Sequence, residues 1–317
     1  MSLIEQAAKR LEQLRQAGVE LPEDKAATEA SEHISLEKSA ASASPPASSP
    51  SQPPLVTKVS SKTSSTQVPT KRVTLDLDAM AASGLLVPNQ SRSLLANEFR
   101  VIKRPLIANA MGKGSKPIQN GNLIMVTSAL PGEGKSFTAV NLAISIAMEL
   151  DNTVMLVDAD VARPSVLTML GLPPAAGLLD AVNEDSLDIS QVLLHTNVEK
   201  LSILPSGTAH PRATELLASE AMIRLLDDMS KRYPDRIIVF DSPPLLLTTE
   251  ARALATHMGQ IVVVVQAGAT TQAAVREAVS TIESCPLKMM VLNQATQSAS
   301  ERYGYGYAYG YGYGNEK

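Results

Sequence analysis

The sequence predicts an α/β fold in which helices cover both faces of a doubly wound, mainly parallel sheet. Six continuous apolar runs rich in β-branched residues lie between Asn122 and Asn293, and helical patterns separate most of them. Strands that are apolar on both faces and alternate with helices are typical of a parallel sheet buried on both sides. A glycine-rich turn directly after the first run indicates, in addition, that this sheet binds phosphate.

The expected elements follow one another through a main domain at residues 111–294. Strands are expected at 123–126, 154–157, 201–204, 237–240, 261–265 and 289–292. The clearest helical patterns are 136–150, 222–232 and 271–283. Each strand is short and each helix spans about three to four turns, which are ordinary lengths for elements of an α/β domain.

Three segments precede this domain. Residues 1–20 carry apolar residues at helical spacing and are expected to form an amphipathic helix. Residues 21–70 are expected to form a disordered linker, since their Ser/Pro/Ala/Thr-rich part buries too little apolar surface. Residues 71–110 are a lead-in segment with a helix from about Ser91 to Lys103, closed near Pro105 because proline interrupts helical hydrogen bonding.

Composition excludes several classes of protein. The net charge of −4 provides no basic face for nucleic acid. Cys285 is the only cysteine, which excludes a disulfide framework and a thiolate metal site. No stretch approaches the roughly 20 apolar residues that span a bilayer, and the first residues lack the apolar region of a signal peptide. A cytoplasmic protein is therefore expected.

A phosphate-binding loop follows the first strand. Residues 129–136, Ala-Leu-Pro-Gly-Glu-Gly-Lys-Ser, fit the P-loop pattern with Ala in place of its first Gly. Gly132 and Gly134 allow the backbone to curl so that its amides point at phosphate oxygens. The helix that follows directs its positive end at the same anion. Lys135 is expected to neutralise phosphate charge, and the Ser136 hydroxyl to bind Mg²⁺.

Two further strands end in aspartate. Asp158 and Asp160 follow the second strand, with Arg163 close by, and Asp241 ends the fourth strand. Ligands of open α/β sheets lie beyond the carboxyl ends of the strands. Because Mg²⁺ prefers oxygen ligands and takes few of them from protein, these carboxylates are candidates for a metal site beside the P-loop.

The three motifs together resemble a known family. The stretches 128–136, 157–164 and 238–244 look like the Walker A, A′ and B motifs of the P-loop NTPases called bacterial tyrosine kinases. The tail, residues 295–317, resembles the tyrosine cluster of that family and is expected to be flexible. The N-terminal part looks like the stand-alone cytoplasmic form associated with exopolysaccharide loci of the PEP-CTERM/exosortase type.

This resemblance implies a function. The chain is expected to be a non-specific protein-tyrosine kinase that uses ATP and Mg²⁺ to phosphorylate its own tail, and thereby to regulate exopolysaccharide synthesis and export. A membrane polysaccharide co-polymerase, or chain-length determinant, would activate it and recruit it indirectly to the inner face of the plasma membrane. The family also implies cycling between a ring of identical subunits and phosphorylated monomers.

The resemblance also assigns roles to residues. The catalytic set is Lys135, Asp158, Asp160 and Asp241, with Asp160 helping to take the tyrosine proton, and the metal set is Ser136, Asp158 and Asp241. The ATP contacts are Ala129, Pro131, Gly132, Glu133, Gly134, Lys135, Ser136, Phe137, Arg163 and, at the adenine, Asn293. The phosphoacceptors are Tyr303, Tyr305, Tyr307, Tyr309, Tyr311 and Tyr313. The family's oligomerisation motif, Glu-x-x-Arg-x-x-Arg, is altered here to Asn97-x-x-Arg100-x-x-Lys103.

Two other readings stay open. Partitioning and division-site ATPases share this fold, but carry a second lysine at the place that Leu130 occupies here. A catalytically inert nucleotide-binding adaptor of a membrane complex is the other alternative. The tail favours the kinase, because its residues extend up to ~3.3–3.6 Å each, roughly 70 Å in all, which reaches its own site or a neighbour's.

Overall fold

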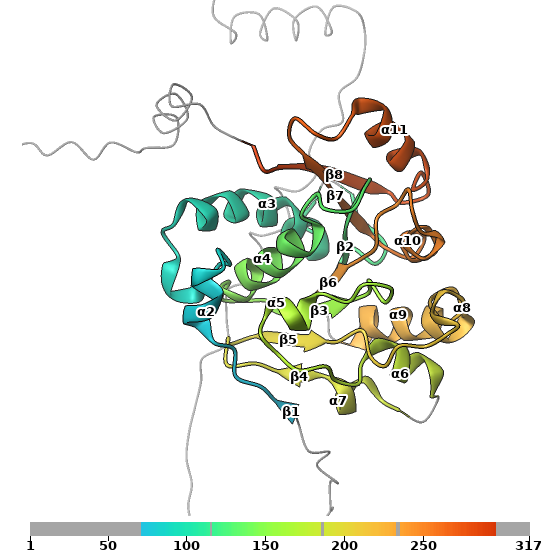
Figure 1. Ribbon diagram of the computed structural model, residues 1–317, viewed down its shortest axis with the longest axis horizontal. Coiled ribbons are helices and arrows are strands. Elements are labelled where there is room, and N and C mark those ends of the chain that lie inside the picture. Colours follow the sequence, from blue (N-terminus) through green and yellow to red (C-terminus); the bar gives the residue numbers. More distant parts are fainter. Residues whose placement is uncertain (1–70, 115, 185–186, 233–234, 296–317) are drawn as a thin grey trace, which may run out of the picture. The chain divides into compact units, whose positions relative to one another are not determined.

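The computed structural model describes residues 71–114, 116–184, 187–232 and 235–295 (Figure 1). The amphipathic helix predicted over 1–20, the linker over 21–70 and the phosphoacceptor tyrosines lie outside these residues. No helix within the described ranges combines the length and the apolar character that a bilayer crossing requires.

The strands form one sheet of eight in the order β1-β4-β5-β3-β6-β2-β7-β8. All neighbours are parallel except β4 and β5, which are antiparallel. The strands are β1 (Lys71–Arg72), β2 (Leu123–Ser128), β3 (Thr153–Asp158), β4 (Leu194–His195), β5 (Leu201–Leu204), β6 (Arg236–Asp241), β7 (Gln260–Gln266) and β8 (Leu287–Asn293). The α/β fold class and all six expected strands are confirmed.

Helices cover both faces of this sheet. One apolar cluster joins it to α2, α3, α4 and α5, and another joins its opposite face to α6 through α11. The helices are α2 (Leu77–Ala82), α3 (Leu94–Ala110), α4 (Lys135–Ala147), α5 (Val166–Met169), α6 (Leu178–Asn183), α7 (Ile189–Val192), α8 (Ala213–Leu217), α9 (Glu220–Arg232), α10 (Thr249–Ala255) and α11 (Gln272–Ser280), with a 3₁₀ turn at Pro88–Gln90. The three expected helices correspond to α4, α9 and α11.

The alternation of side chains explains why the central strands are apolar throughout. In β2, Leu123 and Met125 pack into the cluster under α6–α11, while Ile124 and Val126 pack into the cluster under α2–α5. All four are fully buried. Each such burial stabilises the fold by about 1.5–3 kcal/mol, so both faces of the strand favour this arrangement.

Helix α3 differs from the expectation, because it continues through Pro105 to Ala110. An interior proline costs a helix roughly 3 kcal/mol, and tertiary contacts of the residues that follow it offset this cost. Leu106 is fully buried, and its carbonyl accepts a hydrogen bond of 3.0 Å from Gln260 Nε2. Asn109 Nδ2 donates to Gln260 Oε1 at 3.1 Å, which fixes the last turn against β7.

Candidate active site

The P-loop connects the end of β2 to the start of α4. Gly132 and Gly134 adopt φ values of +84° and +92°, a left-handed conformation that side chains other than glycine rarely take. Gly134 is the N-cap residue of α4, so the first amides of that helix face the loop. A Cβ atom at residue 134 would lie 2.0 Å from Asn293 Nδ2. Both the backbone conformation and the space at residue 134 therefore require glycine.

The carboxylate of Glu133 stabilises the conformation of this loop through hydrogen bonds. Its side chain is buried, with Oε2 accepting a 2.6 Å hydrogen bond from the Leu130 amide and Oε1 hydrogen-bonded to the Thr270 hydroxyl. The sequence placed Glu133 among the ATP contacts, but gave no sign that its carboxylate holds the loop in shape. That role depends on Thr270, which is far away in the chain.

The last strand ends against the same loop. Asn293 Nδ2 donates to the Glu133 carbonyl at 2.9 Å, and Gln294 Nε2 donates to the Gly132 carbonyl at 3.3 Å. The chain therefore leaves β8 at the edge of the sheet that carries the P-loop. The predicted contact between Asn293 and adenine stays a prediction.

The two acidic strand ends lie side by side. Asp158 and Asp241 are register partners at the ends of β3 and β6. Asp158 Oδ2 accepts hydrogen bonds from the amides of Ser165 and Val166 at 3.1 and 3.0 Å. The Ser165 hydroxyl lies 2.9 Å from the Ser136 hydroxyl. The backbone after β3 therefore orients Asp158 and links it to the first turn of α4.

Three carboxylate oxygens at this point are buried without a hydrogen-bond partner: Asp158 Oδ1 and both oxygens of Asp241. Burial raises the pKa of Asp241 to about 7, although the nearby Lys135 charge opposes the shift. Burial likewise raises the pKa of Asp158 to about 6, against two backbone hydrogen bonds. Such groups need a compensating cation, so Ser136, Asp158 and Asp241 fit a bound Mg²⁺.

The described residues contain no cluster of three or more acidic, histidine or cysteine side chains arranged to enclose a metal ion. Mg²⁺ does not need one, because it usually keeps several waters and binds through one or two carboxylates and substrate phosphates. The donor set therefore suits Mg²⁺ that arrives with a nucleotide better than a resident structural metal.

Lys135 lies at the centre of these groups. Its Nζ is 2.7 Å from Asp160 Oδ2, 3.9 Å from Asp241 Oδ1 and 3.3 Å from Ser136 Oγ. Asp160 Oδ1 accepts a hydrogen bond of 3.1 Å from the Arg163 amide, which orients the carboxylate. Lys135, Asp160 and Asp241, predicted from three separate motifs, therefore meet at one point.

A crevice of about 450 Å³ opens beside this cluster. Lys135 and Asp160 line it, together with Pro131, Gly132, Ala162, Arg163, Pro243, Pro244, Leu247 and Thr248. Two of the predicted ATP contacts point elsewhere. The Ala129 side chain is buried in the core, and Phe137 lines a separate groove between α3 and β8.

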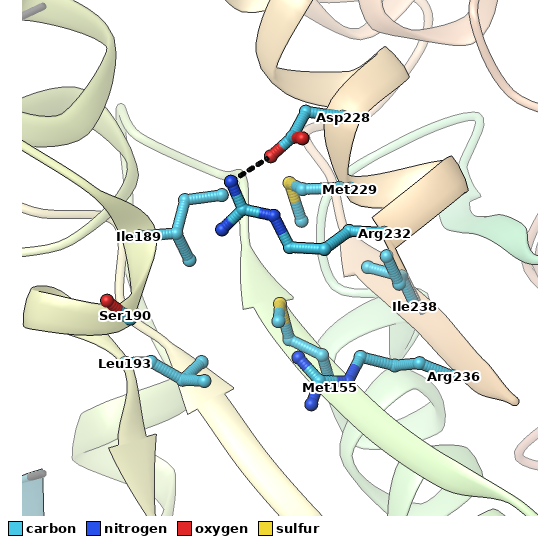
Figure 2. Close-up of a pocket in the computed structure, with 9 residues that line it drawn as sticks. All are labelled: Met155, Ile189, Ser190, Leu193, Asp228, Met229, Arg232, Arg236 and Ile238. Atoms are coloured by element: carbon cyan, nitrogen blue, oxygen red, sulfur yellow. Dashed lines mark ion pairs between the residues drawn. The ribbon is translucent and has the colours of Figure 1, made fainter. Parts of the chain in front are cut away.

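A smaller cavity of about 30 Å³ lies between α7 and α9 (Figure 2). Its walls are Met155, Ile189, Ser190, Leu193, Asp228, Met229, Arg232, Arg236 and Ile238, with Arg232 paired to Asp228 at 3.0 Å. Its volume is large enough to admit water but too small for a nucleotide. Arg236 begins β6, so this cavity lies toward the amino ends of the strands, away from the P-loop.

The residues of the altered oligomerisation motif divide into two groups. Arg100 donates to Asn97 Oδ1 at 2.6 Å and to the Ser91 carbonyl at 3.0 Å, near the surface of α3. Lys103 is 4% exposed, and its ammonium pairs with Glu149 at 2.6 Å and donates to the Ser145 carbonyl. Lys103 therefore fastens α3 to α4 within the chain, which the spacing of the motif alone did not reveal.

Comparisons with known proteins agree with this geometry. Residues 121–295 match the family model described as an AAA domain. Tyrosine-protein kinase YwqD of Bacillus subtilis is 30% identical over 222 residues, which are 69% of this chain and 90% of that protein. The succinoglycan biosynthesis transport protein ExoP of Rhizobium meliloti is 33% identical over 195 residues, 61% of this chain but only 24% of ExoP. The solved structure of the BceF tyrosine kinase domain is 25% identical, with a TM-score of 0.54 over 68% of this chain and 86% of that one.

Proposed function

The chain belongs to the bacterial tyrosine kinase family and is a protein-tyrosine kinase, and from this premise we propose that it phosphorylates the tyrosines of its own C-terminal tail, using ATP and Mg²⁺. One observation carries the proposal. Asn293, the last residue of β8, is hydrogen-bonded to the P-loop at Glu133, so the tail begins beside the crevice that contains Lys135. The acceptor tyrosines follow from residue 303.

The residues around the crevice are suited to holding a nucleotide. The loop amides, the start of α4 and Lys135 would bind the phosphates, and Ser136, Asp158 and Asp241 would bind Mg²⁺. Bound ATP and Mg²⁺ supply the phosphoryl group and neutralise the charge that develops on it during transfer. The unpartnered oxygens of Asp158 and Asp241 support this assignment, because a cation would compensate their burial.

Asp160 is the proposed base for the proton of the acceptor. A tyrosine hydroxyl, with an ordinary pKa of roughly 10, becomes a good nucleophile only when a base accepts its proton. Lys135 now holds Asp160 Oδ2 at 2.7 Å. When Lys135 turns toward a phosphate, that oxygen becomes available to the phenol. A positioned base of this kind contributes about 10²- to 10⁴-fold in rate.

The tail sequence suits a substrate of this crevice. Glycine or alanine separates successive tyrosines, so neighbouring side chains do not hinder the entry of a phenol ring. Complete phosphorylation would add about −1.5 to −2 charges per tyrosine, about −9 to −12 in total. We expect this charge to repel the acidic crevice and other tails, and thereby to dissociate an oligomer. Unchanged mass by light scattering before and after treatment with ATP would contradict that expectation.

The cellular role is proposed from the relatives. ExoP is named as a succinoglycan biosynthesis transport protein, and this chain matches only 24% of its length. We infer that the chain regulates exopolysaccharide synthesis, with a membrane co-polymerase as its activator at the inner face of the plasma membrane. Stimulation of tail phosphorylation by the cytoplasmic segment of such a co-polymerase would test this role.

The kinase proposal is tested by mapping phosphates after incubation with ATP and Mg²⁺. Mass spectrometry should find phosphate on Tyr303–Tyr313 in the unmodified chain and none in the Lys135→Met variant. Lys231→Met, in which the lost lysine is 70% exposed on α9, serves as the matched control and should be phosphorylated normally. Release of free phosphate without phosphotyrosine would indicate an ATPase switch, and an absence of turnover would indicate an inert adaptor.

A further inference from the structure

The outer edge of the sheet at β8 is apolar and exposed. Seven large hydrophobic side chains are exposed among the described residues, and four of them gather here. Leu94 and Val101 on α3 are 62% and 70% exposed, and Met290 and Leu292 on β8 are 60% and 64% exposed. Strand β8 is paired with β7 along one side, and no described strand lies along the other side of β8. Such an edge is a template for a further strand.

Helices α3 and α11 lie on either side of this edge (Figure 1). Residues of each helix line one groove beside β8. The α3 groove has a volume of about 600 Å³ and is lined by Leu94, Leu95, Glu98, Phe99, Val101 and Ile102 with the end of β8. The α11 groove has a volume of about 370 Å³. An added strand would direct alternate side chains into the two grooves, because side chains alternate across a sheet.

The chain itself enters the larger groove. Ala295, the last described residue, lines the α3 groove together with Asn293 and Gln294. Gln294 has a φ of +57°, so the backbone turns away from the strand direction directly after β8. Its side chain is fixed by Gln266 at 2.8 Å and by the Gly132 carbonyl. The tail therefore starts with a turn, at a fixed point, beside an uncovered apolar surface.

The tail has the sequence pattern of a strand with one aromatic face. From Tyr303 to Tyr313 every second residue is tyrosine, and the residues between are glycine or alanine. In extended backbone this period of two places all the rings on one side. An edge strand flanked by these two grooves can accept such a segment, with the rings in the larger α3 groove and the glycines over the smaller α11 groove.

We propose that the tail of the same chain docks as a ninth strand, antiparallel to β8, with its tyrosine rings in the α3 groove. Residues 296–302 would form the return connection, and a turn at Gln294 makes the antiparallel direction the natural one. The seven residues of β8 span about 23 Å, which accommodates three or four successive tyrosines. The docked rings lie outside the crevice, so this contact holds acceptor tyrosines away from Lys135.

Continuity of the chain favours its own tail over a second copy as the occupant. A segment tethered at the rim of the groove is present at an effective concentration in the millimolar range, far above that of a separate molecule. Within the part of the chain that the structure describes, Glu98 is the one charged residue that lines the groove; Thr138, Asn293 and Gln294 add uncharged polar groups and the other lining residues are apolar, which suits uncharged phenols. A phosphorylated tyrosine would bring about −1.5 to −2 charges next to that carboxylate, so phosphorylation should release the tail.

Tyrosine fluorescence reports on the tail directly. The chain has no tryptophan, and six of its seven tyrosines lie in the tail. Acrylamide quenching is measured on the full chain without nucleotide, and on a Leu94→Asp/Val101→Asp double variant. We expect quenching to increase about twofold or more in the double variant, because desolvated rings become exposed. Leu150→Asp, at a residue that is 86% exposed elsewhere on the surface, is the matched control and should leave quenching unchanged.

Hydrogen exchange tests the strand pairing. The amides of residues 287–293 that do not face β7, together with the amides of residues 303–309, should be protected in the full chain. The double variant should lose the protection of these amides, while far-ultraviolet circular dichroism shows that its helices are retained. Two results would overturn the proposal: quenching as strong in the full chain as in denaturant, or protection of β8 that rises with protein concentration and so identifies a second copy. Neither readout uses ATP, so a failure of the kinase assay is distinguished from a failure of docking.

Discussion

Replacing Asp241 by Asn should stabilise the nucleotide-free protein at neutral and alkaline pH. Asp241 is fully buried, and its two carboxylate oxygens have no hydrogen-bond partner. Burial raises its pKa from 3.8 to about 7. The folded state therefore binds a proton more tightly than the unfolded state, and stability falls as pH rises from about 3.8 to about 7 and is level above that. An amide resembles the protonated acid and avoids this loss.

The magnitude follows from the same pKa. Between pH 5 and the folded-state value lie about two pH units, each worth about 1.4 kcal/mol. The stability advantage of Asp241→Asn should therefore grow by about 3 kcal/mol from pH 5 to pH 8. The attraction between Lys135 and Asp241 is already included in this value, because it opposes the rise in the pKa, and Lys135 keeps its closer partner Asp160 at 2.7 Å in the variant.

Urea denaturation in EDTA at pH 5, 6, 7 and 8 measures this difference in unfolding free energy. Asp235→Asn, a change at an exposed residue directly before β6, is the control and should show no such growth with pH. An advantage that is constant with pH, or a variant less stable than the parent at pH 8, would refute the assignment of an uncompensated buried charge. Addition of Mg²⁺ and ATP should stabilise the parent and not the variant, because only the parent has the carboxylate to bind the cation.

Three further predictions follow from the loop, from Lys103 and from the proposed docking of the tail. Gly134→Ala should abolish nucleotide binding and destabilise the fold by about 1–3 kcal/mol, since it combines a positive φ with a Cβ placed 2.0 Å from Asn293 Nδ2. Calorimetry measures the nucleotide binding and urea denaturation measures the stability. Normal nucleotide binding by the variant would contradict the first expectation. Lys103→Ala should lower the unfolding free energy by about 2 kcal/mol, because it removes a buried charged donor between α3 and α4; Arg104→Ala, at an exposed residue of the same helix, should change it by less than about 0.5 kcal/mol. Val101→Asp should leave ATP binding unchanged. If docking withholds the tyrosines, this variant should speed the first phosphorylation of the tail in a rapid-quench experiment. An unchanged rate would show that docking does not regulate phosphorylation.

Local sequence patterns were sufficient to predict the part of the site that depends on short spacings. The P-loop requires glycines and a lysine at fixed intervals, and the carboxyl ends of parallel strands meet at one edge, so Lys135, Asp160 and Asp241 were expected together and are together. The six long strands were predictable for a similar reason, because apolar residues on both faces leave few other folds.

Contacts between distant residues were not predictable. Glu133 stabilises the P-loop with the help of its hydrogen bond to Thr270, and the burial of Lys103 depends on Ser145 and Glu149. Helix α3 continues past Pro105 because Gln260, the first residue of β7, donates a hydrogen bond to the carbonyl of Leu106. In each case a long-range contact outweighs the local preference. The two-residue strands β1 and β4 were missed because so short a pattern has no recognisable period.

The most direct test of the central claim is phosphate mapping of the tail in an Asp160→Asn variant, together with its affinity for ATP. If Asp160 accepts the phenol proton in a crevice that the P-loop and the acidic strand ends assemble, the variant should bind ATP and Mg²⁺ like the parent. Its tail phosphorylation should be slower by about 10²- to 10⁴-fold. Phosphorylation of Tyr303–Tyr313 at the parent's rate in this variant would contradict the account.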